Sequence, residues 1–303
     1  MPFDTGYPSA DARDDWNRAR RRRVLSRLAT RLRRAPHDVD VILPYDEALA
    51  ALGYVTQRDL GLQVIAIDTV VGSVDRTADF DRAFLPATNR PKQRFERLAE
   101  AVRRGEPIDP IDVIRIGEAH FVKDGHHRVA VLRALGIPTV EAHVVEVVTQ
   151  VGMGHDLRIS DLPLKGSQRL FRERVPLPPE GEERIRLSDP WSYGVLAENV
   201  EAWGFRAMQA RRELLDRRTV AEAWYREEYV PVVAVLKESG LLDPDEPETE
   251  GYMRLAGERW RLLQTWSWDD SVIDRLRRVR SVTGGKPRDA QAGEVGYAAP
   301  SDG

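Results

Sequence analysis

The residues best suited to chemistry lie at 123–128, where the sequence reads Lys-Asp-Gly-His-His-Arg. The segment 111–116 alternates apolar and polar residues and a second extended run follows it, which predicts a β-hairpin before this turn. A short apolar helix is predicted after the turn, with Gly136 at its end. Backbone N–H groups at a helix start lack intrahelical partners and lie at the positive end of the helix dipole. Since Lys123 and Arg128 add formal charge, the turn is predicted to bind an anion such as a phosphate.

The turn residues Gly125, His126, His127 and Arg128, placed between a strand and a helix, resemble the nucleotide-phosphate motif of the ParB/sulfiredoxin superfamily. The resemblance covers residues 63–148 and is closest in form to the ParB-like branch that includes ADP-dependent free-serine kinases. It implies a nucleotide-binding domain, with ADP, ATP or CTP as the cofactor and with any Mg²⁺ carried on the nucleotide. No separate metal site is predicted, because no Cys or Glu-x-x-His pair accompanies the two adjacent histidines.

The motif departs from two branches of that superfamily. Partitioning ParB proteins usually carry Gly-Glu-Arg-Arg, so His126 stands where the Glu would be and His127 where the first Arg would be. Sulfiredoxins need a reactive cysteine at the position of His126, and the chain has no cysteine, which excludes their chemistry. A simpler interpretation also stays open, in which the turn is a tight strand-to-helix connection whose histidines hydrogen-bond neighbouring loops.

Basic residues on the preceding helix extend the predicted site. In ParB-like folds the corresponding helix borders the nucleotide pocket, so Arg90 and Arg94, near its start, are expected to contact phosphate. A solvated basic face would explain either arginine taken singly. The predicted cofactor-binding residues are Lys123, Asp124, Gly125, His126, His127, Arg128, Arg90 and Arg94.

A phosphotransferase would also need a carboxylate that accepts the proton of the substrate hydroxyl. Asp68, Asp75, Asp79 and Asp81 lie in a buried strand or in the charged loop after it, and the sequence does not rank them firmly. The residues that we take as the catalytic set are His126, His127, Asp68 and Asp75.

Three functions fit these residues. The first is a ParB-like nucleotide-binding protein linked to DNA binding, chromosome partitioning or regulation. The second is an ADP- or ATP-dependent phosphotransferase that acts on a small hydroxyl substrate, and the third is a catalytically silent regulatory scaffold that binds protein. A basic recognition helix after the motif would favour partitioning, and we find none in the sequence, whereas an acidic residue facing the motif would favour the kinase.

The composition sets outer limits on function. The chain has 303 residues, enough for two domains, and 46 Lys and Arg against 49 Asp and Glu give a net charge of -3, so no global attraction to nucleic acid is expected. The absence of cysteine excludes disulfides and thiolate metal sites. No apolar run approaches the ~20 residues of a membrane span and no signal pattern is present, so we expect no membrane partner and a cytoplasmic location.

The N-terminal part carries a strongly basic helix, predicted at 16–34. Four consecutive arginines at 20–23 precede apolar residues at helical spacing, Val24, Leu25 and Leu28 among them. The helix therefore either contacts DNA or RNA phosphates through residues 20–34, or docks by its apolar stripe and leaves the arginines in solvent.

The predicted fold class is α+β, a ParB/sulfiredoxin-like mixed domain with a C-terminal all-α domain. Six of the seven tryptophans lie in that second domain, where aromatics at helical spacing are typical of a core. We expect it to contact a protein partner or a second copy. The predicted segments are a basic helical arm at 1–62, the mixed domain at 63–148, a linker at 149–184, the helical domain at 185–282 and a disordered tail at 283–303.

Overall fold

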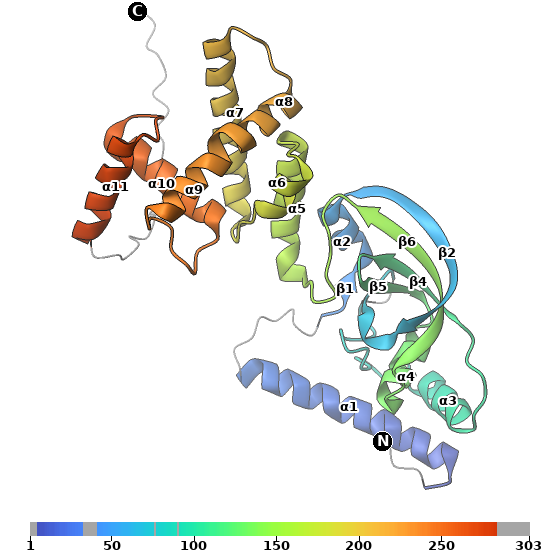
Figure 1. Ribbon diagram of the computed structural model, residues 1–303. Helices are drawn as coiled ribbons and strands as arrows, with labels where there is room; N and C mark the ends of the chain where they lie inside the picture. Colours follow the sequence, from blue (N-terminus) through green and yellow to red (C-terminus); the bar gives the residue numbers. More distant parts are fainter. Residues whose placement is uncertain (1–4, 33–40, 76, 90, 284–303) are drawn as a thin grey trace, which may run out of the picture. The chain divides into compact units, whose positions relative to one another are not determined.

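The computed structural model describes residues 5–32, 41–75, 77–89 and 91–283 (Figure 1). It confirms the predicted combination of a mixed α+β domain with a C-terminal all-α region, because a six-stranded mixed sheet with helices is followed by a helical region. None of the helices within these ranges is long and apolar enough to cross a membrane. The predicted tail lies outside the described residues except for Thr283.

The chain divides into two compact units. Met1–Pro176 with Ser188–Glu201 forms the first, and Leu177–Leu187 with Ala202–Gly303 forms the second. The first unit contains the sheet and the predicted site. The predicted basic arm is therefore not separate from the mixed domain: a strand and a helix before residue 63 belong to the sheet unit.

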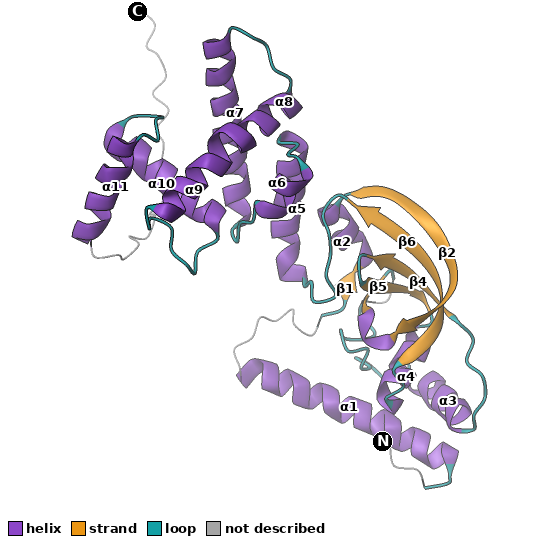
Figure 2. Cartoon of the chain, in the orientation of Figure 1, coloured by secondary structure: helices purple, strands orange, loops and turns teal. Residues whose placement is uncertain are grey.

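The six strands of the described residues form one sheet, drawn in orange in Figure 2, with the order β1-β3-β5-β4-β6-β2. β4 and β5 form the antiparallel hairpin predicted from the sequence, while β3 pairs with β5 and β4 with β6 in parallel. β2 pairs antiparallel with β6 and lies at the edge. The strands are β1 (Leu43–Pro44), β2 (Tyr54–Ala66), β3 (Val70–Ser73), β4 (Ile111–Ile116), β5 (Ala119–Asp124) and β6 (Thr139–Thr149).

Helices cover both faces of this sheet. Successive strand residues point to opposite faces, so Phe121 packs in the core beneath α2 and α5 while Val122 packs in the core beneath α3 and α4. Both side chains are fully buried. The helices of this unit are α1 (Pro8–Leu32), α2 (Tyr45–Leu52), α3 (Lys92–Arg103), α4 (His126–Leu135), α5 (Leu162–Arg174) and the first part of α7 (Pro190–Arg211), with short 3₁₀ turns η1 (Ile67–Thr69) and η2 (Ile159–Asp161).

Helix α1 packs on α3 by a face that differs from the predicted leucine stripe. Ala12, Trp16 and Ala19 are buried, and the Trp16 ring meets the Phe95 ring edge-on with centroids 5.4 Å apart. Small alanines one turn on either side of the indole let the two helices approach closely. The residues of the predicted stripe are exposed instead: Leu25 by 65%, Val24 by 58% and Leu28 by 50%.

The segment 149–184, expected to be an irregular linker, contains helices. Pro163 lies in the first turn of α5, where the missing N–H is tolerated. Leu162 and Phe171 of that helix are buried, and α5 packs on α2. The turn-rich composition of this segment therefore led to a wrong prediction, because α5 is a helix that completes one face of the sheet unit.

The second unit is a helical bundle with an aromatic core. Its centre is a π-helical segment, Trp224–Tyr229, in which Trp224 and Tyr229 are buried and contact Tyr252. Trp260 and Trp266 are not part of this buried core. Their rings stack with centroids 4.4 Å apart, and the two residues are 40% and 45% exposed. The helices are α6 (Pro179–Arg184), the rest of α7, α8 (Arg217–Ala223), α9 (Val230–Glu238), α10 (Glu248–Leu263) and α11 (Asp270–Thr283).

Candidate functional site

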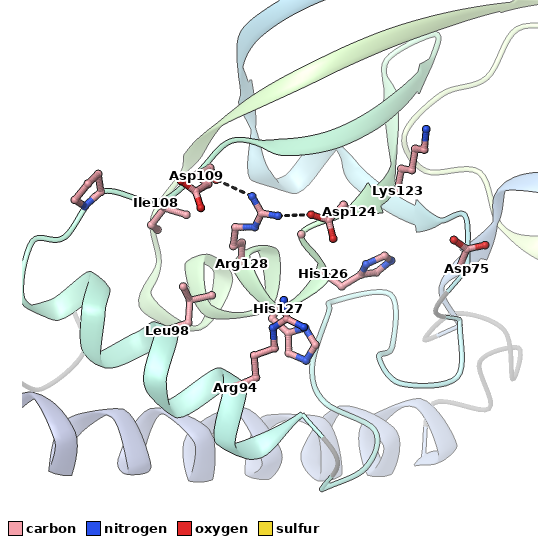
Figure 3. A pocket seen from close by; sticks show the side chains of 12 residues that line it. Asp75, Arg94, Leu98, Ile108, Asp109, Lys123, Asp124, His126, His127 and Arg128 are labelled. Atoms are coloured by element: carbon pink, nitrogen blue, oxygen red, sulfur yellow. Dashed lines mark hydrogen bonds and ion pairs between the residues drawn. The ribbon is translucent and has the colours of Figure 1, made fainter.

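A cavity of about 400 Å³ opens at the turn between β5 and α4 (Figure 3). Eight of the ten predicted site residues line it, although they come from three separate parts of the chain. Asp68 does not line the cavity, and Arg90 lies outside the described residues. The lining residues are Asp75, Arg94, Leu98, Pro107, Ile108, Asp109, Lys123, Asp124, Gly125, His126, His127 and Arg128.

Gly125 is required by the geometry of the turn. Its φ of 102° lies in the left-handed region that other residues rarely adopt. A Cβ at this position would stand 2.4 Å from Cγ2 of the buried Ile111. The glycine thus lets the backbone turn sharply against β4 and start α4 at His126.

The start of α4 borders the cavity. Gly125 is the N-cap residue and its carbonyl accepts the N–H of Val129, but no side chain of the described residues caps the helix. The first N–H groups of an α-helix have no partner within the helix, and those of α4 lie at the positive end of the helix dipole.

Arg128 is already engaged within the protein. Its Nη1 donates to the carbonyl oxygens of Asp109, at 3.0 Å, and of Pro110, and its Nη2 donates to the carboxylate of Asp124. The side chain is 19% exposed. Arg128 thus ties the start of β4 to the turn and supports the site, and its contact with phosphate stays a prediction.

Two other cations line the cavity without such partners. Lys123, at the end of β5, and Arg94, in the first turn of α3, are both exposed and make no hydrogen bond or ion pair with any residue that the structure describes. Figure 3 shows them on different sides of the α4 start. They supply positive charge that an anion in the cavity can use.

The two histidines occupy different environments. His126 is buried; its Nε2 lies 2.7 Å from Oγ of Ser73, and its ring packs beside Phe80 and Phe84, each with centroids 6.3 Å apart. His127 is half-buried, lines the cavity and meets Phe80 edge-on at 5.5 Å. His126 thus hydrogen-bonds a neighbouring strand, whereas the simpler interpretation expected a neighbouring loop, and His127 is the histidine more open to a ligand.

The structure separates the four candidate carboxylates. Asp75 is exposed, lines the cavity and has no partner among the described residues. Asp81 is buried, accepts the N–H groups of two residues in its own loop and faces Arg23 at 3.3 Å. Asp68 and Asp79 do not line the cavity. Asp75 is therefore the base candidate that the geometry retains.

Sequence reasoning missed two groups of site residues. The first is Asp109, a second exposed carboxylate at the cavity without a side-chain partner among the described residues. The second consists of Leu98, Pro107 and Ile108, which form an apolar wall of the cavity. One sequence pattern could have pointed to the segment 107–110 as part of the site: two prolines flank an apolar residue and an aspartate just before a predicted strand. Ser73, the partner of His126, showed no such pattern.

Buried ionisable groups near the site have structural roles. Arg133 of α4 donates to the carbonyls of Ile67, Val70 and Arg82, and burial lowers its pKa to about 10 although Asp68 acts in the opposite direction. These bonds fix α4 against η1 and β3. The helix that begins at the cavity is thereby held at its far end as well.

A second buried group, His120, lies in β5. Its Nδ1 is 2.8 Å from Oγ1 of Thr69, and burial, with a smaller effect from Arg115, lowers the pKa of its imidazole to about 4. His120 does not line the cavity. It therefore belongs to the frame of the sheet.

Comparison with known proteins adds little to this description. No family model matches the chain, and no curated protein matches it. Among solved structures, a Pnob8-like ParB-N domain is similar at 13% identity and a TM-score of 0.21, over 75% of this chain and 98% of that one.

Proposed function

We propose that the cavity binds a nucleotide through its phosphates. The observation that carries the proposal is the convergence, on one cavity, of the start of α4 and two cations, Lys123 and Arg94, that no described residue neutralises. Backbone N–H groups at such a start and nearby Lys or Arg side chains are a common phosphate-binding arrangement. The resemblance of residues 125–128 to the ParB-like motif supports the same ligand.

The remaining lining suits the rest of a nucleotide. Leu98, Pro107 and Ile108 offer an apolar wall for a base or ribose, and Asp75 and Asp109 offer carboxylates. No group of three or more His, Cys, Asp or Glu side chains within the described residues could hold a metal by itself. Mg²⁺ usually binds through one or two carboxylates together with phosphate oxygens, so Mg²⁺ carried on ADP, ATP or CTP fits these two residues.

The test is a thermal-shift screen of ADP, ATP, CTP and GTP, with and without Mg²⁺, followed by calorimetry. A ligand that binds only the folded protein raises its stability, by about 2.7 kcal/mol at one hundred times Kd. Lys123→Ala and Arg94→Ala should each weaken binding about tenfold or more, since a hydrogen bond to a charged group contributes roughly 1.5–3 kcal/mol. Arg97→Ala is the control, because Arg97 is exposed on the same helix but does not line the cavity.

Two results would contradict this proposal. One is the absence of a shift with any of the four nucleotides at millimolar concentration. The other is an equal loss of affinity in the Arg97→Ala control, which would show a general effect of net charge rather than a contact.

Asp75 favours a second function, phosphoryl transfer to a small hydroxyl compound. The hydroxyl oxygen would attack the terminal phosphorus, the bond from that phosphorus to the leaving oxygen would break, and the hydroxyl proton would pass to the Asp75 carboxylate. Asp75→Asn should then abolish most turnover while binding changes little. A wild-type protein that binds nucleotide but never releases ADP or phosphate, with free serine or DNA present, would rule out this function.

Contacts with nucleic acid and with proteins are further proposals, each resting on an exposed surface. Arg21, Arg22 and Arg27 of α1 are exposed and suited to phosphates of DNA. The half-exposed pair Trp260 and Trp266 offers an aromatic surface to a protein partner or second copy, as a regulatory scaffold would require.

A further inference from the structure

Strand β2 is a long strand at the edge of the sheet. It has 13 residues and pairs only with β6, so one row of its backbone N–H and C=O groups has no partner strand among the described residues. β1, at the opposite edge, has two residues. Figure 2 shows β2 as the outermost long strand of the sheet. A free edge of this length is a template for another extended strand.

The side chains of β2 are also uncovered. Tyr54, Val55, Leu62 and Val64 are 51%, 53%, 55% and 67% exposed, and Ile65 is the buried residue of the strand. Natural edge strands are commonly protected by Lys, Pro or several charges. β2 has no Lys or Pro, and its charged side chains are one Arg and one Asp.

A bulge interrupts β2 without removing this edge. The register with β6 shifts between Asp59 and Gly61, and Oδ1 of Asp59 accepts the N–H of Gly61 at 2.8 Å. On either side of the shift the pairing is regular, over 56–59 and 61–66. Each regular stretch keeps its outer backbone groups.

We propose that β2 pairs antiparallel with β2 of a second copy of this chain, so that the sheet continues across a two-fold axis. The order of residue types along the strand is similar in both directions: apolar at 54–55, charged at 58–59, and apolar again at 62, 64 and 65, with Gln63 as the exception. Antiparallel pairing therefore places the apolar start of each strand beside the apolar end of the other. One Arg and one Asp per strand bring no net charge together, so the pairing meets no overall repulsion.

The absence of cysteine in the chain allows a direct test by single-cysteine cross-linking. Asp59→Cys places an exposed thiol near the middle of β2, where the two strands would be about one strand spacing apart. A short homobifunctional maleimide should join two such chains. Val148→Cys is the matched control, because Val148 is 41% exposed on the neighbouring strand β6. Its two copies would be separated by at least three strand spacings, about 14 Å, and should not be joined.

A second variant tests the association itself by sedimentation of the full chain. Leu62→Lys with Val64→Lys places like charges on the edge at exposed positions, so the fold should persist while the mass falls from two chains to one. Val148→Lys should stay dimeric. The proposal is overturned if the wild type sediments as one chain up to its solubility limit. It is equally overturned if the double lysine variant stays dimeric, or if Asp59→Cys and Val148→Cys cross-link equally.

Discussion

Nε2 of His126 lies 2.7 Å from Oγ of Ser73, and both residues are buried. This contact joins the first residue of α4 to the last residue of β3, so the helix start that borders the cavity is fixed to a strand as well as to the turn. His126 also packs beside two phenylalanines, Phe80 and Phe84. One half of the conspicuous histidine pair therefore positions the site.

Ser73→Ala should destabilise the protein, because it removes the hydroxyl that faces a buried imidazole nitrogen. The cost of such a group left without its partner is about 1–3 kcal/mol. Urea unfolding measures it. Ser281→Ala is the control, since that hydroxyl donates to Arg278 at an exposed position and its removal should change stability by less than about 0.5 kcal/mol. Equal stability of the two variants would show that the His126 contact contributes nothing.

Gly125→Ala should be more harmful than Gly136→Ala, although both glycines have positive φ, 102° and 72°. A side chain in this region costs roughly 1–2 kcal/mol. At Gly136 nothing lies within 4 Å of the added Cβ, whereas at Gly125 it overlaps Ile111, which adds about 1–3 kcal/mol of overpacking. Unfolding midpoints compare the two variants, and Gly125→Ala should also weaken nucleotide binding. Equal losses of stability would contradict the close approach at Gly125.

Arg128→Ala and Lys123→Ala should distinguish a residue that stabilises the turn from a residue that contacts the nucleotide. Arg128 donates to two carbonyls and a carboxylate, so its removal should lower the free energy of unfolding by roughly 1.5–3 kcal/mol and weaken binding through the disturbed turn. Lys123 has no partner among the described residues, so its removal should leave stability within about 0.5 kcal/mol and reduce affinity alone. Urea unfolding and calorimetry on both variants provide the comparison. Unchanged stability of the Arg128→Ala protein would contradict the supporting role of Arg128.

Local patterns were sufficient for the elements that build the turn. Alternation predicted the hairpin of β4 and β5, and Gly136 ends α4 in the left-handed conformation expected of a helix-terminal glycine. The clustering of Lys123 through Arg128 beside Arg94 also agrees with the predicted set, since all line one cavity. Residues close in sequence at a strand-to-helix turn must lie close in space, which explains this agreement.

Contacts between distant segments could not be predicted in the same way. The carbonyls that accept hydrogen bonds from Arg128 belong to Asp109 and Pro110. Because every residue has a backbone carbonyl, the sequence does not show which of them will accept. The docking face of α1 is centred on Trp16 rather than on Leu25, because packing against Phe95 selects it. Both outcomes depend on tertiary packing, which overrides local apolar spacing.

His120 should make stability depend on pH. Burial lowers the pKa of the folded imidazole to about 4, below its ordinary value of 6.5. Between these values the unfolded chain binds one more proton than the folded one, so the stability present above pH 6.5 is lost as the pH falls toward 4, by up to about 3 kcal/mol. His120→Gln should flatten the curve of unfolding free energy against pH over that range. A curve of the same slope in His120→Gln would contradict the assignment.

The arginines of α1 should divide into two groups if the helix binds DNA. Arg20 and Arg23 donate to the Ala87 carbonyl, at 3.2 Å and 2.8 Å, and so hold α1 to the loop before α3. Arg21 and Arg22 are exposed and make no hydrogen bond or ion pair with described residues.

On duplex DNA each neutralised phosphate contributes a slope of about 0.9 to the fall of log affinity with log salt. Arg21→Ala with Arg22→Ala should thus reduce that slope by about 1.8, and Arg20→Ala with Arg23→Ala should instead lower the unfolding midpoint. Fluorescence anisotropy over a salt series measures the slopes, and an unchanged slope in the first variant, or no DNA binding at low salt, would show that α1 is structural.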